Sequence, residues 1–275
     1  MLDTDANVGS ILVDPGGDLD VAASVSGFTL QWTGLNTDLS NARIDLMGDL
    51  TLQSTFGEDY SIGSVNGGFN LTLNGSGQVT LNGAIGNTSR LNNLTTDAGG
   101  STVISGDIRT TGTHTFNDPV TLTTNITLAG SSPSFAQGLD ADGNSVSLVY
   151  TSALILPDQL APLSNVNNLT VGESQSRGNS VNAQLNGTVT TSGSQNYLTA
   201  MFLLSNSVLE STGNGSITLR QVDGAQALTI NTGGLTDFRG NLGFDQRLTW
   251  LETDVQGSNR LTNTSDIFLF DGTDP

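Results

Sequence analysis

Few side chains in this chain could carry out nucleophilic or acid–base chemistry, and they lie far apart in the sequence. His114 is the only histidine and cysteine is absent, so a Ser-His-Asp or Cys-His arrangement would depend on His114. No Gly-x-Ser-x-Gly nucleophile elbow accompanies it. An internal repeat described below aligns His114 with Gln195. A position that accepts either residue is typical of a polar turn, so we predict no catalytic residue and no enzyme activity.

Two acidic stretches have part of the pattern of a calcium-binding loop. Asp140-Ala141-Asp142-Gly143-Asn144 resembles the start of such a loop, but Ser145 stands where the glycine is expected and Thr151 where a bidentate Glu is needed. The stretch at residues 14–20 resembles a glycine-rich calcium repeat and occurs once, whereas those repeats bind through stacking. The first stretch is therefore interpreted as an acidic turn, the single copy at 14–20 does not indicate a site, and we predict no metal site and no cofactor.

The main enzymatic alternative is a polysaccharide-cleaving β-helix. Such an enzyme needs clustered carboxylates and a basic residue near the sugar, whereas the acidic residues here are scattered among turns and lysine is absent. Arg90 and Arg247 recur as a repeat pair, which favours a structural contact to a turn carbonyl or to a nearby Asp. The positions that would reveal a carbohydrate site, if they met in a groove beside an exposed Tyr150, are Asp140, Asp142, Asp158 and Arg177.

The charge balance narrows the range of partners. The formal net charge is −18, so the long-range field repels nucleic acid and anionic lipid. No apolar run is long enough to cross a bilayer. The first residues lack the basic start and apolar stretch of a signal peptide, from which we expect a fragment of a longer protein.

The elements that position these side chains are expected to be short β-strands. Thr alternates with Leu, Val or Ile, a pattern that places the branched hydroxyl residue on the solvated face and the aliphatic residue inside. Turn pairs such as Asn74-Gly75, Asn82-Gly83 and Gly233-Gly234 separate the strands. The clearest predicted strands are residues 28–32, 50–52, 71–73, 79–81, 120–122 and 126–128.

Internal repetition favours a coil over a sandwich. Residues 65–97 align without gaps on residues 222–254, and residues 106–116 align on residues 187–197. The first match keeps the turn glycines Gly67/Gly224 and Gly86/Gly243 and inward leucines. A compound unit seen twice is typical of a solenoid whose coils stack on their neighbours. Between about residues 131 and 180, three prolines and a denser apolar run predict an irregular insertion, which either packs against the flank or carries a specificity loop.

These lines of sequence resemble the strand repeats of large bacterial adhesins of the filamentous haemagglutinin and autotransporter type. One repeat segment of these adhesins is similar to Thr110-Thr111-Gly112-Thr113-His114-Thr115-Phe116-Asn117-Asp118-Pro119-Val120-Thr121-Leu122 in this chain. The same pattern recurs in part from Thr190 to Tyr197. The other is similar to residues 65–97 and 222–254. The resemblance implies a right-handed parallel β-helix exposed outside the cell, exported within a longer polypeptide, whose repeats serve as scaffold without catalytic residues.

The sequence therefore predicts an all-β protein: a right-handed parallel β-helix, with an antiparallel β-sandwich as the alternative. Residues 1–275 are expected to form one elongated solenoid segment of a larger protein, with the insertion at about 131–180. The predicted function is that of an extracellular or cell-surface stalk or multivalent adhesion surface, and the alternative is a carbohydrate-binding or polysaccharide-cleaving β-helix. Expected partners are neighbouring coils and surface glycans or matrix, with neither nucleic acid nor membrane insertion.

Overall fold

The chain is folded almost entirely into short β-strands. The computed structural model describes residues 11–13, 19–21, 28–32, 37–54, 57–152, 154–173, 183–262 and 265–270. Among these residues the only helix is the 3-10 turn η1 (Asp158–Leu160), and no helix there has the length and apolar character to cross a membrane. The chain divides into two compact units, residues 1–140 and 141–275.

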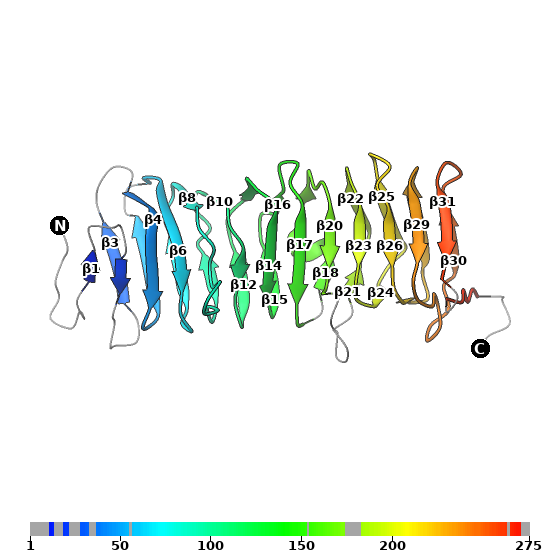
Figure 1. Cartoon of the computed structure of the whole chain (residues 1–275), viewed down its shortest axis with the longest axis horizontal. Helices are drawn as coiled ribbons and strands as arrows, with labels where there is room; N and C mark the ends of the chain where they lie inside the picture. Colours follow the sequence, from blue (N-terminus) through cyan, green and yellow to red (C-terminus); the bar gives the residue numbers. More distant parts are fainter. Residues whose placement is uncertain are drawn as a thin grey trace. The chain divides into compact units, whose positions relative to one another are not determined.

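The first unit is a parallel β-solenoid in which successive coils add strands to the same sheets (Figure 1). One sheet holds, in spatial order, β1 (Ile11–Val13), β2 (Leu19–Val21), β4 (Thr37–Leu46), β6 (Tyr60–Asn66), β8 (Gln78–Leu81), β10 (Ser101–Ile104), β13 (Val120–Leu122) and β16 (Leu139–Asp140). A second holds β3 (Phe28–Trp32), β5 (Leu50–Ser54), β7 (Leu71–Asn74), β9 (Leu94–Thr96), β12 (Thr113–Phe116) and β15 (Ser132–Phe135). In addition, β11 (Ile108–Arg109) pairs with β14 (Ile126–Gly130).

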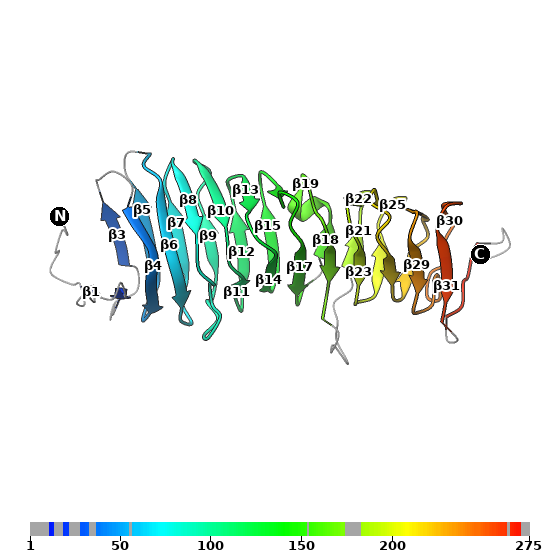
Figure 2. The same cartoon turned by 45° about the horizontal axis from the view of Figure 1, so that its top comes forward.

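The second unit is likewise built from stacks of parallel strands (Figure 2). One stack contains β17 (Val146–Tyr150), β20 (Leu169–Val171), β23 (Gln195–Tyr197), β26 (Ile217–Leu219), β29 (Leu235–Phe238) and β31 (Ser258–Leu261). The others are β18 (Leu154–Leu156), β21 (Ala183–Leu185), β24 (Met201–Leu203) and β27 (Val222–Asp223), then β22 (Thr188–Thr191), β25 (Ser207–Ser211), β28 (Ala227–Thr232) and β30 (Trp250–Thr253). The short strand β19 (Leu163–Ser164) follows η1.

Stacked aliphatic side chains form the core of each coil. Leu50, Leu71 and Leu94 occupy one column, in parallel register, with exposures of 2%, 0% and 0%. The threonines next to them face outward and are partly exposed. Burial of one such leucine contributes about 1.5–3 kcal/mol, and because no coil covers its own inner face, the stacking supplies this stabilisation.

The prediction of a right-handed parallel β-helix is confirmed. The β-sandwich alternative is wrong, because the described strand pairs are parallel except for β1 with β2. The predicted strands also appear: residues 28–32 form β3, and residues 120–122 form β13. Thr121 and Thr127 take the expected outward positions on their strands.

The sequence repeat is a structural repeat. Gly67 and Gly224 have φ angles of 123° and 122°, and Gly86 and Gly243 both have 72°. The Gly86 amide donates to the Val65 carbonyl at 2.6 Å, and the Gly243 amide donates to that of Val222 at the same distance. These positive angles are readily adopted only by glycine, so the matching glycines specify the same corner in both units.

The stretch from about 131 to 180 contains several strands of the solenoid. β15 stacks on β12 in parallel register, and β17 and β18 pair with β20 and β21. Between β18 and β19 the chain leaves the strand pattern to form η1, which is flanked by cis peptide bonds before Pro157 and Pro162.

A ladder of polar side chains joins four coils of the first unit. Asn70 donates its side-chain amide to Asp49 at 2.9 Å, and Asn93 donates to Asn70 at 2.8 Å. The Asn93 oxygen then accepts the backbone amide of Thr113 at 2.8 Å. Each step spans one coil, with sequence separations of 21, 23 and 20 residues. The donors all point toward the earlier coil, which aligns their dipoles and strengthens each bond.

Candidate functional site

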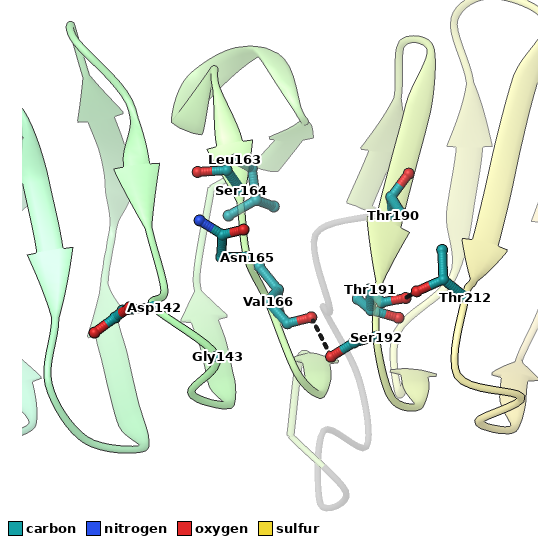
Figure 3. Close-up of a pocket in the computed structure, with 10 residues that line it drawn as sticks. All are labelled: Asp142, Gly143, Leu163, Ser164, Asn165, Val166, Thr190, Thr191, Ser192 and Thr212. Atoms are coloured by element: carbon teal, nitrogen blue, oxygen red, sulfur yellow. Dashed lines mark hydrogen bonds between the residues drawn. The ribbon is translucent and has the colours of Figure 1, made fainter.

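A lateral groove of the second unit is the best candidate for a ligand site (Figure 3). Its volume is about 610 Å³. Four successive coils line it, through the turn before β17, the residues in and after β19, the end of β22 and the residue after β25. The lining residues are Asp142, Gly143, Leu163, Ser164, Asn165, Val166, Thr190, Thr191, Ser192 and Thr212.

Hydrogen bonds between coils hold the groove in shape. The Ser192 amide donates to the Val166 carbonyl at 2.8 Å, and the Thr212 amide donates to that of Thr191 at 2.9 Å. The hydroxyls of Ser192 and Thr212 also point back at these carbonyls, at 3.4 and 3.3 Å (Figure 3). The wall therefore consists of stacked hydroxyl residues whose backbone positions are fixed by these hydrogen bonds between coils.

The other end of the groove is formed by two tight turns. Asp142 and Asn165 have φ angles of 48° and 52°, a left-handed conformation that Asp and Asn tolerate better than other side chains. The Gly143 amide donates to the Asn165 carbonyl at 2.8 Å, which links the two turns. Asp142 lies apart from the hydroxyls of Ser192 and Thr212 (Figure 3). A neutral, hydrogen-bonding ligand would match this lining, because it contains several hydroxyl and amide groups and only one carboxylate, which lies away from the hydroxyls of Ser192 and Thr212.

The residues expected to mark a carbohydrate site do not gather in this groove. Of those that the structure describes, only Asp142 lines it. Asp140 is in β16 of the first unit, paired with Thr121. The Asp158 carboxylate accepts a hydrogen bond from the Asn186 amide at 2.6 Å. Tyr150 is partly buried and so differs from the exposed side chain expected, and Arg177 lies outside the described residues.

Of the two calcium-like stretches, the structure describes residues 140–144 in full and residues 14–20 only in part. Residues 140–144 include a turn in which the Asn144 amide donates to the Ala141 carbonyl at 2.8 Å, in agreement with the predicted acidic turn. The stretch at 14–20 falls largely outside the described residues, which include only its last two positions, in β2. Across the parts of the chain that the structure describes, no three His, Asp or Glu side chains are placed to hold a metal ion.

The interpretation of His114 as a polar turn residue is wrong. His114 lies within β12 and its side chain is fully buried. Strand alternation explains this position, because Thr113 and Thr115 face outward while His114 and Phe116 face inward. Its register neighbours are Leu94 and Pro133. Desolvation in these apolar surroundings lowers the pKa of His114 to about 4.

Gln195, the repeat partner of His114, is also buried in a strand. Its side-chain amide donates to the carbonyls of Glu210 at 2.8 Å and Val189 at 3.1 Å, and its oxygen accepts the Tyr197 hydroxyl at 2.9 Å. A buried amide is tolerated where its groups are hydrogen-bonded. The repeat thus preserves an inward polar position next to an inward aromatic residue, Phe116 or Tyr197.

Arg90 and Arg247 make the structural contact predicted for them. Arg90 donates from Nη1 to the Thr110 carbonyl at 3.2 Å, and Arg247 donates to the Leu269 carbonyl at 3.3 Å. In both cases the acceptor lies in the next coil. Of the two predicted acceptors, a carbonyl or an Asp, these bonds use the carbonyl.

A different pair of arginines surrounds a buried carboxylate. Asp237 is 1% exposed and accepts hydrogen bonds from Arg239 Nε at 2.6 Å and Arg260 Nε at 2.8 Å. The hydrogen bond from Arg260, together with that from Arg239, holds the pKa of Asp237 below its usual value. Because both arginine side chains are about half exposed, solvent screens their attraction.

The hydroxyl residues of the groove carry no motif that marks them in the sequence. The internal repeat of residues 187–197 includes Thr190, Thr191 and Ser192. Their neighbour in the preceding coil is the segment around Asn165, which has no counterpart in the repeat alignment. The repeat alignment alone carries no signal for this contact.

Comparison with known proteins assigns this chain to no group. No model of a protein family matches it, and neither a curated protein nor a solved structure is significantly similar to it.

Proposed function

We propose that this chain is a non-enzymatic structural segment of a secreted or cell-surface bacterial protein. It would act as a stalk that carries other regions and offers weak, repeated contacts to surface glycans or matrix. The observation that carries the proposal is the ladder from Asp49 through Asn70 and Asn93 to Thr113, in which polar side chains bind one another from coil to coil. Side chains engaged in this way reinforce the solenoid itself.

Two further features support a stalk. Arg90 and Arg247 use their guanidinium groups to tie one coil to the next. The net charge of −18 gives a field that repels other copies and polyanions, which suits a segment that stays separate and solvated outside the cell.

A second candidate is a carbohydrate-binding segment, which the hydroxyl-lined groove of the second unit favours. Ser192 and Thr212 are exposed there beside the amide of Asn165, and such groups can exchange hydrogen bonds with sugar hydroxyls. This candidate concerns binding, because the predicted acidic residues do not meet in the groove.

A glycan and matrix-protein array probed with the full chain separates the two candidates. A stalk that makes only weak, repeated contacts is expected to give no strong signal for any one glycan. The groove is tested with Ser192→Arg, which fills it, and with Thr123→Arg as a control at an exposed position elsewhere. Glycan binding that Ser192→Arg abolishes and Thr123→Arg retains would contradict the stalk as the sole function. Binding that both variants retain would contradict the groove.

A further inference from the structure

The C-terminal end of the second unit presents apolar side chains and strand edges that the described chain does not cover. β30 and β31 are the last strands of their stacks. Leu261 is 47% exposed, Ile267 38% and Leu269 40%. A cluster of this kind on a strand edge is a typical surface for pairing with another strand.

The same columns are fully buried one coil earlier. Leu261 stacks on Phe238, and Leu269 stacks on Leu248. Phe238 and Leu248 are 2% and 0% exposed, because the last coil covers them. The last coil therefore continues the core columns, and the side chains at the ends of these columns, Leu261 and Leu269, stay partly exposed.

The first unit contains an equivalent face, which is covered. The register of β10 on β8 is the same as the register of β31 on β29. Ser101 of β10 therefore corresponds to Ser258 of β31. The repeat match of residues 65–97 with 222–254 leads directly into these two strands. Ile104 and Ile108 in the first unit thus take the positions of Leu261 and Ile267.

The coil that covers the equivalent face is visible in the structure. Ile104 stacks beneath Leu122 of β13, and Ile108 stacks beneath Leu128 of β14. Both isoleucines are 0% exposed. The covering strands read Val-Thr-Leu and Ile-Thr-Leu, with the aliphatic residues inward and threonine outward.

We propose that the C-terminal face formed by Leu261, Ile267 and Leu269 docks a parallel β-coil of this chemistry. The partner supplies two short strands with aliphatic residues at alternate inward positions. One strand pairs along β31, where its backbone amides and carbonyls complete the ladder in the manner of strand addition. The partner's aliphatic side chains then bury Leu261 and Ile267 as Leu122 and Leu128 bury Ile104 and Ile108.

The proposal can be tested by adding to the C-terminal end a copy of the coil that covers the equivalent face in the first unit. The test protein carries residues 1–270 followed by a second copy of residues 112–140, which joins at the position that the repeat indicates. A control carries the same graft with Asp in place of the copies of Leu122 and Leu128. Amide hydrogen exchange is measured along β31, and size-exclusion chromatography reports the oligomeric state.

The expected result is a monomer in which the amides of residues 259–261 exchange at least about tenfold more slowly than in the unmodified chain, with no slowing in the control graft. Equal slowing in both grafts, or in neither, would overturn the proposed register. So would an unmodified chain that dimerises through this end, because the partner would then be a second copy.

A single substitution keeps the test independent of whether the graft folds. Leu261→Asp in the unmodified chain should lower stability less than Ile104→Asp does, because Leu261 contacts Phe238 on one side and is half exposed, whereas Ile104 is covered on both sides. In the grafted protein, Leu261→Asp should cancel the protection of β31. Equal losses of stability from Leu261→Asp and Ile104→Asp in the unmodified chain would show that Leu261 is already covered, and would overturn the proposal.

Discussion

The buried histidine gives a sharp prediction about acid sensitivity. The pKa of His114 falls from an ordinary value of 6.5 to about 4 because burial disfavours the charged ring. The unfolded chain therefore binds a proton between pH 6.5 and 4 that the folded chain does not bind. Stability rises with pH through this window and is lost on acidification. The shift corresponds to about 2 kcal/mol lost between pH 7 and pH 5, and about 3 kcal/mol by pH 4.

The perturbation that tests this reasoning is His114→Gln, because Gln195 occupies the equivalent inward position in the repeat. The variant should lose less stability than the natural chain between pH 7 and pH 5, by about 2 kcal/mol. Urea unfolding at each pH gives the difference. Carboxylates such as Asp118, whose pKa is raised chiefly by burial, titrate in both proteins and cancel in the comparison.

A direct assay is available because the chain has one histidine. The Cε1 proton of His114 should give one NMR signal that stays unchanged from pH 8 to pH 5.5 and moves with a midpoint near pH 4. A midpoint near 6.5 in the folded protein, or parallel loss of stability in the natural chain and His114→Gln, would refute the link between burial and acid sensitivity.

Three further predictions concern stability. Gly224→Ala should cost about 2 kcal/mol more than Gly187→Ala in urea unfolding, since the φ angles are 122° and 114° but only at Gly224 would the new Cβ lie 2.6 Å from the Leu203 carbonyl; equal costs would contradict this. Asn70→Ala should cost about 1–3 kcal/mol by breaking the ladder on both sides, whereas Thr72→Ala, at an outward position in β7 just after Asn70, should cost a few tenths of a kcal/mol by the same measurement. Asp237→Asn should lower the melting temperature at pH 7, and this difference from the natural chain should shrink as the pH falls from 3.8 through the lowered pKa of Asp237, because the pairing is lost only as the carboxylate is protonated; a difference that does not shrink below pH 3.8 would count against the pairing.

The sequence was sufficient for the coil because its local and long-range patterns agree. The alternation in Leu71-Thr72-Leu73 predicts which side chains are inward, and the matched glycines predict corners that recur. Gly67 and Gly224 have almost the same φ angle. The fold class, the strands and the arginine contacts could be predicted for this reason.

His114 and the groove could not be predicted in the same way. Polarity suggested a turn for His114, but the alternation that includes Phe116 sets its phase, and the strand geometry outweighs the preference of the imidazole for water. The groove arises where Asn165 of one coil meets Thr190 and Ser192 of the next. Such contacts depend on how neighbouring coils stack, and the repeat alignment does not include the segment around Asn165.

The ladder of Asn70 and Asn93 also determines how the first unit would respond to a pulling force. Its bonds run between coils, so tension along the stack would load each junction in turn and peel coils off singly. A detached coil of 20–23 residues would release about 70 Å of chain. The unit could then dissipate a sudden load in small steps, each resisted by one rung of side-chain bonds, while the remaining coils stay folded.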